Sequence, residues 1–274
     1  MGSLDGKVAF ITGAGRGQGR SHAVRLAAEG ADIIAVDVLG PLDLVNYPQS
    51  NDEDRAETIR LVEEQGRKIV FNKADVGNFD QLKAAFDDGY DKLGRVDIIM
   101  ANAGVYAVAI GEEKDPVAIF METIRVNLLG VRNTVHVAVD KMIEQGDGGS
   151  ILMTSSTQGT SGRGADGSAA MEGYCSSKHG VVGLMRAYAN WLAKHNIRVN
   201  VIQPTGVDTT FINNDAVAAW ITGDASNAGA LSNLLDVEIM QPEDVSEAVA
   251  WLASPAAKYV TGILLPVDAG FGVR

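Results

Sequence analysis

The chain has 274 residues, 46% of them hydrophobic, and a formal net charge of -12 at pH 7. This length can bury the core of one α/β domain, while the acidic balance predicts that neither nucleic acids nor anionic membranes are partners. No apolar run reaches the roughly 18 residues of a transmembrane helix, and the short start leaves no room for a signal peptide. The single cysteine, Cys175, excludes an internal disulfide framework and favours a cytoplasmic location. The four histidines lack the spacing of metal ligands, so no metal is expected.

The first element is a short apolar strand that leads into a glycine-rich turn. Residues 8–11 form an apolar run without alternation, which is typical of a strand buried on both faces of a parallel sheet. Gly13, Gly15, Gly17 and Gly19 follow, and a helix-like pattern begins at once. This arrangement presents backbone N–H groups and a positive helix end to a phosphate, with no Cβ in the way. The alternative is an ordinary glycine-rich turn.

A second buried strand is predicted at residues 31–36, and Asp37 follows it directly. An acid about 20 residues beyond a glycine-rich loop can accept hydrogen bonds from the ribose hydroxyls of an adenosine. The two strands together therefore predict a dinucleotide-binding fold. The alternative reading of Asp37 is a chance acid at a strand end.

Strand-like and helix-like segments alternate through the rest of the chain, which predicts parallel βαβ units. Residues 39–54 are too long and irregular for an ordinary βα connection, so we expect an insertion on the cofactor side. The further predicted strands are residues 68–74, 96–101, 150–154, 198–203 and 262–267, and the predicted helices are residues 54–65, 79–93, 116–143, 173–195 and 243–253. We predict a single-domain, doubly wound Rossmann fold, α/β in class, with seven parallel strands and helices on both faces. Side chains at the carboxyl ends of the strands should line one crevice: Thr12, Asp37, Asp75, Asn102, Ser156 and Pro204.

The sequence YCSSK places Tyr174 and Lys178 four residues apart, on one face of a predicted helix. A free phenol has a pKa of about 10 and is a poor base at neutral pH, but a nearby cation lowers that pKa. The phenol could then exchange a proton with a substrate alcohol or carbonyl. Because YxxxK is common by chance, the alternative is an ordinary exposed pair.

From end to end the chain resembles a short-chain dehydrogenase/reductase. The matching pieces are TGAGRGQG at residues 12–19, Asp75-Val76, ANAG at residues 101–104, Asn127, TSS at residues 154–156, YCSSK, and PTGVDT at residues 204–209. The family usually has Asn where Ala101 stands, a change that leaves the backbone role of this turn intact.

The resemblance implies a catalytic tetrad of Asn127, Ser156, Tyr174 and Lys178. Tyr174 would be the general acid/base, and Ser156 would bind the reacting oxygen. Lys178 would hold the nicotinamide ribose and lower the pKa of the phenol, while Asn127 would hold a water that relays protons. The family uses the second serine of this pair, which favours Ser156 over Ser155.

Asp37 favours NAD over NADP, because a 2′-phosphate would meet its carboxylate. Arg16 is the contrary signal, since a basic residue in the glycine loop can bind that phosphate. The resemblance assigns Asp75 and Val76 to the adenine and Val207 and Thr209 to the nicotinamide carboxamide. The residues expected to bind NAD are Gly13, Arg16, Gly17, Gln18, Gly19, Asp37, Val38, Asp75, Val76, Asn102, Ala103, Gly104, Tyr174, Lys178, Pro204, Gly206, Val207 and Thr209.

Residues 205–241 are expected to form a substrate lid. Residues 211–240 contain no Lys or Arg, which argues against phosphorylated or CoA-linked substrates and favours a small apolar alcohol or ketone. The apolar side chains there are Phe211, Ile212, Val217, Trp220, Ile221, Leu231, Leu234, Leu235, Ile239 and Met240. The alternative is that they only pack a lid helix onto the core. Residues 156–174 form either a flap over the substrate or a surface loop.

The insertion, together with PVDAGF near the C-terminus, makes the chain similar to carveol-dehydrogenase-like members of the mycofactocin-associated branch. The resemblance implies that residues 41–52 cover the adenine end and retain NAD, that mycofactocin takes up the electrons, and that the substrate is a terpenoid such as carveol. It also implies a homotetramer built on the two long helices. The alternative enzyme is an NADPH-dependent carbonyl or 3-oxoacyl reductase. A non-enzymatic dinucleotide sensor is the other alternative, although a sensor has no use for the tetrad.

Overall fold

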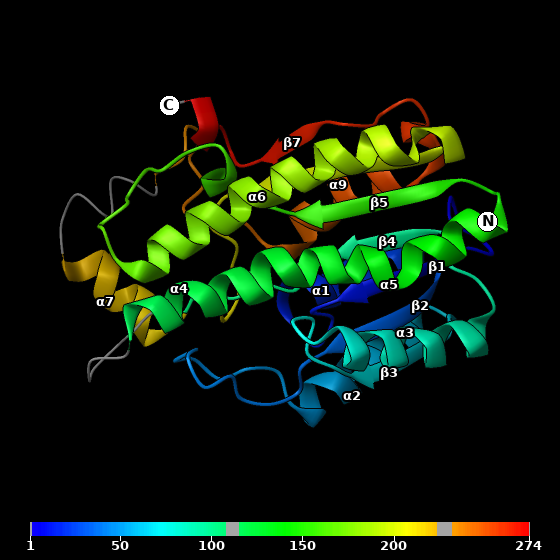
Figure 1. The fold of residues 1–274 in the computed structure, drawn as a ribbon, viewed down its shortest axis with the longest axis horizontal. Coiled ribbons are helices and arrows are strands. Elements are labelled where there is room, and N and C mark those ends of the chain that lie inside the picture. Colours follow the sequence, from blue (N-terminus) through cyan, green and yellow to red (C-terminus); the bar gives the residue numbers. More distant parts are fainter. Residues whose placement is uncertain (1, 108–114, 224–231, 274) are drawn as a thin grey trace.

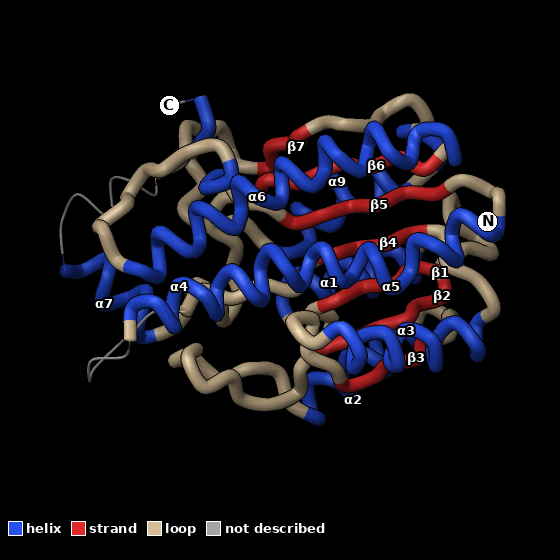
Figure 2. The backbone as a smooth tube through the Cα atoms, viewed as in Figure 1, coloured by secondary structure: helices blue, strands red, loops and turns tan. Residues whose placement is uncertain are grey.

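The computed structural model describes residues 2–107, 115–223 and 232–273, and within them it shows one parallel sheet between two layers of helices (Figure 1). The strand order is β3-β2-β1-β4-β5-β6-β7. The strands are β1 Val8–Thr12, β2 Asp32–Asp37, β3 Ile69–Lys73, β4 Ile98–Ala101, β5 Gly149–Thr154, β6 Ile197–Pro204 and β7 Leu264–Val267. Figure 2 shows these strands side by side with helices in front and behind. The predicted seven-stranded, doubly wound Rossmann architecture is confirmed.

Eight α-helices lie in the described part of the chain. They are α1 Gly17–Ala28, α2 Asp52–Glu64, α3 Phe79–Leu93, α4 Pro116–Ile124, α5 Gly130–Gln145, α6 Ala169–Leu192, α7 Asp215–Gly223 and α9 Pro242–Ala253. A π-helical turn at Arg125–Leu129 joins α4 to α5, so that the predicted helix at residues 116–143 is one helical run with an irregular middle. Such π-bulges often occur at functional sites because they redirect side chains.

The sheet is buried on both faces, as its unbroken apolar strands predict. Phe10 of β1 belongs to the core beneath α3, α5 and α6, where it packs with Phe86 and Met185. The next residue, Ile11, points to the opposite core, where it packs with Leu26 of α1 and Leu252 of α9. Alternating side chains of one strand therefore hold two helical layers in place.

The crevice lies where the strand order reverses, between β1 and β4. The ends of three strands are joined there by side chains. Asn102, just after β4, donates from Nδ2 to the carbonyl oxygen of Thr12 at 3.2 Å. Thr154, at the end of β5, donates from Oγ1 to Oδ1 of Asn102 at 3.1 Å. These bonds fix the floor of the region where ligands bind in open parallel sheets.

Two helices differ from the sequence prediction. The helix predicted to begin at residue 173 begins at Ala169, because Ser168 caps it by accepting a hydrogen bond from the Met171 amide at 3.3 Å. The lid contains a short helix, α7, that the sequence did not delimit. Leu231 and the rest of residues 224–231 lie outside the described residues, as do the side chains of Trp220 and Ile221.

None of the helices in the described ranges is long and apolar enough to span a membrane. The described side chains also bring together no group of three His, Cys, Asp or Glu residues that could hold a metal ion.

Candidate active site

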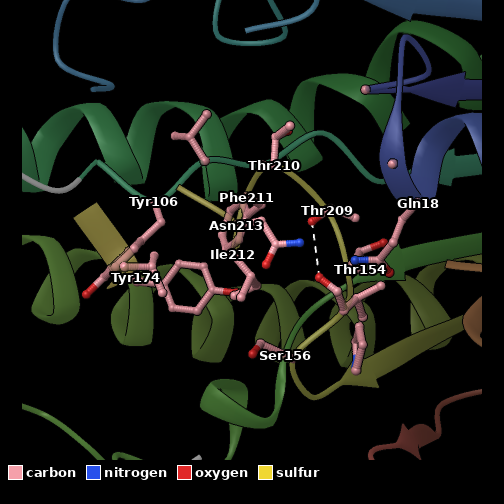
Figure 3. Close-up of a pocket in the computed structure, with 18 of the residues that line it drawn as sticks. Gln18, Tyr106, Thr154, Ser156, Tyr174, Thr209, Thr210, Phe211, Ile212 and Asn213 are labelled. Carbon is pink, nitrogen blue, oxygen red and sulfur yellow. Dashed lines mark hydrogen bonds between the residues drawn. The ribbon is translucent and has the colours of Figure 1, made fainter. Parts of the chain in front are cut away.

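A cavity of about 1130 Å³ opens at the carboxyl ends of the strands. Part of its lining is drawn in Figure 3. The lining includes every residue expected to bind the dinucleotide, from the glycine loop to Thr209, and also Ser156, Tyr174 and Lys178. Asn127 does not line it, and neither does Thr12. The prediction that Thr12 lines the crevice is wrong, because its side chain is buried and its Oγ1 accepts a hydrogen bond from the Asn102 amide at 3.3 Å. Residues from seven separate regions of the sequence therefore meet in one cavity.

Tyr174 and Lys178 lie on the same face of α6, as their spacing predicts. The side chain of Ser156 lies close enough to the Tyr174 hydroxyl to lower the pKa of the phenol. The Nζ atom of Lys178 lies 5.6 Å from the centre of the Tyr174 ring and donates to the carbonyl oxygen of Thr154 at 2.9 Å. The lysine is buried, so the pair is no ordinary exposed i,i+4 contact.

The two serines after β5 have different surroundings. Ser155 donates from Oγ to the carbonyl oxygen of Lys178 at 2.9 Å, which turns its hydroxyl toward the backbone of α6. Ser156 accepts from the Gln158 amide at 3.2 Å, lines the cavity, and lowers the pKa of Tyr174. The structure therefore places the hydroxyl of Ser156, and not that of Ser155, beside the phenol.

Burial governs the pKa values of this group. It raises the pKa of Tyr174 to about 12, against the opposing effect of the hydrogen bond with Ser156. It also lowers the pKa of Lys178 to about 8, because the ammonium loses water. The sequence predicted a phenol pKa lowered by the lysine, but in the chain by itself burial raises that pKa, and the lowering influence comes from Ser156. A cationic ligand beside the phenol would lower the pKa of Tyr174.

Asn127 lies in the π-helical turn, fully buried behind the cavity wall. Its Nδ2 donates to the carbonyl oxygen of Val105 at 2.8 Å, and its Oδ1 accepts from the Val105 amide at 2.7 Å. The side chain thereby fixes the backbone that follows β4. Its Nδ2 also lies 3.4 Å from Oγ of Ser177 on α6.

The glycine loop is packed too closely for side chains. Gly13 has a φ of 69°, and a Cβ there would lie 2.8 Å from the Cα of Ala103. Gly17 has a φ of 54°, and its Cβ would lie 3.0 Å from Cγ2 of Thr209. The loop thus stays close to both neighbouring walls of the crevice.

The side chain of Gln18 gives an independent sign of a ligand. Its Oε1 atom is buried in the described structure without a hydrogen-bond partner, and the residue lines the cavity (Figure 3). Buried acceptors are normally satisfied, so this atom fits a cavity that receives a donor-rich molecule. The residues present therefore suit a dinucleotide.

Asp37 is held by three donors. Its Oδ2 accepts from the Gly15 amide at 2.7 Å, and its Oδ1 accepts from the Val38 amide at 2.7 Å and from the Ser50 hydroxyl. A carboxylate offers about four acceptor positions, so about one is left for a ligand hydroxyl.

Asp75 is fixed at another edge of the cavity. Its Oδ2 pairs with Nη1 of Arg125 at 2.6 Å, and its Oδ1 accepts from the Gly77 amide at 2.8 Å. The backbone of the neighbouring Val76 is held by Asn133, whose Nδ2 donates to its carbonyl oxygen at 2.9 Å. Both groups assigned to the adenine are thus rigidly placed.

Three residues of the segment 157–168 line the cavity, namely Thr157, Gln158 and Arg163, while Thr160, Gly162 and residues 165–167 are exposed. Thr157 and Gln158 are buried. The guanidinium of Arg163 donates to the carbonyl oxygen of Phe271 at 3.0 Å and lies 4.5 Å from the centre of its ring. The C-terminal turn therefore anchors this segment beside the site.

The sequence did not single out three aromatic residues that the structure brings into the cavity as a group with Tyr174. They are Tyr47 from the insertion, Tyr106 after β4, and Phe211, which had been grouped only with the apolar lid. One signal was available. Tyr47 is the single aromatic residue among residues 39–54, and a large ring in a polar, proline-containing segment indicates a buried contact.

Comparisons with known proteins agree with this geometry. The family model described as short chain dehydrogenase matches residues 7–219. An uncharacterized oxidoreductase of Mycobacterium tuberculosis is 52% identical over 98% of this chain and 97% of its own. The (-)-trans-carveol dehydrogenase of Rhodococcus erythropolis is 41% identical over 98% of this chain and 99% of its own.

A solved structure is similar over the full length. The carveol dehydrogenase of Mycobacterium avium in complex with NAD superposes with a TM-score of 0.92 at 45% identity, covering 100% of both chains. Fold, motif order and these relatives agree, and the chain belongs to the short-chain dehydrogenase/reductase family.

Proposed function

We propose that this protein is an NAD-dependent oxidoreductase that interconverts a small apolar secondary alcohol and its ketone. The observation that carries the proposal is that Tyr174, Ser156 and buried Lys178 line one cavity together with the glycine loop and Asp37. The similarity to proteins named carveol dehydrogenase, one of them in complex with NAD, supports it.

The proposed reaction assigns a role to each of four side chains. In the oxidation, Tyr174 takes the hydroxyl proton of the alcohol, Ser156 stabilises the charge on the reacting oxygen, and the carbinol carbon loses a hydride. NAD supplies the chemistry of accepting that hydride. Lys178 binds the nicotinamide ribose and favours the phenolate. Asn127 positions the Val105 backbone and a proton-relaying water beside the cavity.

The contacts of Asp37 support NAD over NADP. With three acceptor positions already used, the carboxylate can take a ribose hydroxyl, whereas a 2′-phosphate would face uncompensated charge. Arg16, the contrary signal, is bonded from Nη2 to the carbonyl oxygen of Pro48. The alternative NADPH-dependent reductase predicts tighter binding of NADPH than of NADH, which side-by-side affinity measurements decide.

Apolar side chains line much of the cavity around Tyr174, and the charged lid residues that also line it, Asp215, Asp236 and Glu238, are acidic. The apolar lining includes Val105, Tyr106, Met171, Phe211, Ile212, Val217, Leu235 and Phe271. The guanidinium of Arg163 already donates to the carbonyl oxygen of Phe271 and packs on its ring. A terpenoid alcohol such as carveol suits this surface better than a charged substrate.

We further propose that residues 41–52 retain the bound NAD and that mycofactocin accepts the electrons. The insertion reaches the ribose site through the bond from Ser50 to Asp37, and it reaches the glycine loop through the bond between Pro48 and Arg16. Denaturing the purified protein and assaying the supernatant for NAD tests retention, and cofactor-free preparations would count against it.

The proposal also includes a homotetrameric assembly and a cytoplasmic location. Exposed apolar side chains gather on the helical run and on α6, among them Val117, Met121, Leu129 and Trp191, which supports a homotetramer. The single cysteine supports a cytoplasmic location.

The decisive test of the activity is a panel of terpenoid and aliphatic alcohols, supplied with NAD and with an artificial electron acceptor. Turnover of neutral secondary alcohols is expected. Turnover confined to acyl-carrier or phosphorylated substrates would contradict the proposal.

A further inference from the structure

Four aromatic rings meet at the substrate end of the cavity. Tyr106 packs edge-on against Tyr174, with ring centres 5.5 Å apart. Phe211 lies 5.8 Å from Tyr174, 6.4 Å from Tyr106 and 6.3 Å from Tyr47. We call these four residues the aromatic wall. Figure 3 shows Tyr106, Phe211 and Tyr174 together in the cavity lining.

Tyr47 is the member of the wall that comes from the insertion. Figure 1 shows the connection between β2 and α2 extending to the left beyond the strand ends. Tyr47 is buried within this connection, at 7% exposure. Its hydroxyl accepts a hydrogen bond from the Tyr106 amide at 3.3 Å, and its ring meets the edge of Phe211. One side chain therefore contacts both the segment after β4 and the start of the lid.

The insertion is anchored at its other end by Ser50, whose hydroxyl bonds Asp37. Between the two anchors, Gln49 donates from Nε2 to the carbonyl oxygen of Tyr47 at 3.0 Å. Only two residues separate the ring at the substrate end from the hydroxyl at the ribose site. The segment from Tyr47 to Ser50 thus bridges the two ends of the cavity.

We propose that Tyr47 is a positioning residue for the substrate, holding Tyr106 and Phe211 against Tyr174 so that the insertion shapes the substrate pocket as well as the cofactor crevice. This inference deepens the proposed function and rests on it. The aromatic wall presents flat apolar surface beside the phenol, so it favours a neutral carbocyclic alcohol, whose rigid ring loses little entropy on packing.

A second consequence concerns the proton. Tyr106 and Phe211 pack against the ring of Tyr174, and burial is the main cause of the raised pKa of Tyr174. Loosening the wall should admit water and move that pKa down. The rising limb of kcat/KM against pH for alcohol oxidation should therefore shift to lower pH, an effect that a merely weakened fold would not produce.

The test compares Tyr47→Leu with Tyr47→Phe in NAD-loaded protein. Tyr47→Leu should raise KM for carveol about tenfold, with a smaller change in kcat, and should shift the pH profile. Tyr47→Phe keeps the ring, so KM should stay within about threefold of the wild-type value. Asn46→Ala is the matched control, because Asn46 is exposed, adjacent in sequence and outside the cavity lining.

A double-mutant cycle tests the contact itself. If Tyr47 acts through Phe211, then Tyr47→Leu should add little to the KM of a Phe211→Leu variant. If the two substitutions raised KM independently, so that their fold-changes multiplied in the double variant, the proposal would be overturned. A wild-type KM and pH profile in Tyr47→Leu would overturn it as well. Melting temperatures establish that each variant is folded.

Measuring the affinity for the ketone tests the role of Tyr47 without depending on the proposed activity. Calorimetry should show about tenfold weaker binding of carvone to Tyr47→Leu than to the wild type. If the wild type turned over no alcohol while this difference persisted, the proposed function would fail and the role of Tyr47 would stand. Equal ketone affinities would remove the role of Tyr47 alone.

Discussion

The protonation state of Tyr174 depends on its surroundings in the cavity and on the charge of any ligand bound beside it. Burial raises its pKa to about 12, and the Ser156 side chain opposes this rise. Lys178, with a pKa lowered to about 8, is held to Thr154. The phenol is therefore protonated at neutral pH in the chain alone, and a cationic nicotinamide ring would favour its ionisation.

Replacing Tyr174 with Phe should abolish the proton transfer while leaving the ring packing with Tyr106 and Phe211 in place. We expect kcat to fall by about a hundredfold to ten thousandfold, which is the usual contribution of general acid–base catalysis. Calorimetric NAD affinity should remain within a few-fold of the wild-type value. Activity retained by the variant would remove Tyr174 from the mechanism.

Replacing Asp37 with Ser should change the cofactor preference. The substitution removes the charge that opposes a 2′-phosphate and keeps a short polar side chain. The ratio of NADP to NAD affinity should rise at least tenfold, measured by fluorescence titration of the two reduced cofactors. An unchanged ratio would show that another group, such as Arg16, controls the selection.

At the scale of elements, α1 and α9 pack through a buried polar cluster. His22 on α1 is fully buried, and its Nδ1 lies 2.8 Å from Oγ of Ser246 on α9. Its Nε2 has no hydrogen-bond partner in the described structure. Burial lowers the pKa of His22 to about 3, so the imidazole is neutral in the folded protein. This packing depends on a group that titrates readily once it is exposed.

The linkage predicts acid sensitivity. Between pH 6.5 and 3, the unfolded chain binds a proton at His22 that the folded chain does not bind, so stability falls as pH falls through this window. The loss from this residue is up to roughly 1.4 kcal/mol for each pH unit. Denaturant titrations of His22→Gln should show a shallower decline below pH 6.5 than the wild type. Parallel declines would mean that other groups dominate.

The insertion yields a prediction about cofactor release. Ser50→Ala removes the hydroxyl that bonds Asp37, and one lost hydrogen bond to a charged group is worth roughly 1.5 kcal/mol or more. The rate of NAD release, followed by exchange against labelled NAD, should increase about tenfold. Asn46→Ala should release NAD at the wild-type rate. Equal release rates from Ser50→Ala and the wild type would exclude a role for this bond in retention.

At the scale of the whole molecule, the apolar surface lies on the long helices. Met121 is 54% exposed on α4, and Leu129 is 39% exposed just before α5. A charge placed within an apolar subunit interface would be desolvated without a partner. Met121→Glu and Leu129→Glu should therefore shift the proposed tetramer to smaller species in sedimentation velocity. Gln65→Glu, at the exposed C-terminal end of α2, serves as the charge-matched control.

The fold was predictable because its signals are local. Apolar runs gave all seven strands, and Gly94, with a φ of 79°, ends α3 where the sequence predicted. The start of α6 was missed by four residues, since the preceding glycine-rich stretch has no periodicity and the cap at Ser168 gives only a weak local signal. The boundaries within the lid were missed for a similar reason.

By itself, the sequence determined the order of strands and helices, the glycine loop, the acid at the end of β2, and the spacing of Tyr174 and Lys178 on one helical face. Tertiary structure decided which atoms meet: Ser50 with Asp37, Tyr47 with Tyr106 and Phe211, and His22 with Ser246. The physical reason is that the hydrophobic periodicity of strands and helices depends only on a few neighbouring residues. Contacts between loops far apart in the chain depend instead on how the packed layers bring their ends together.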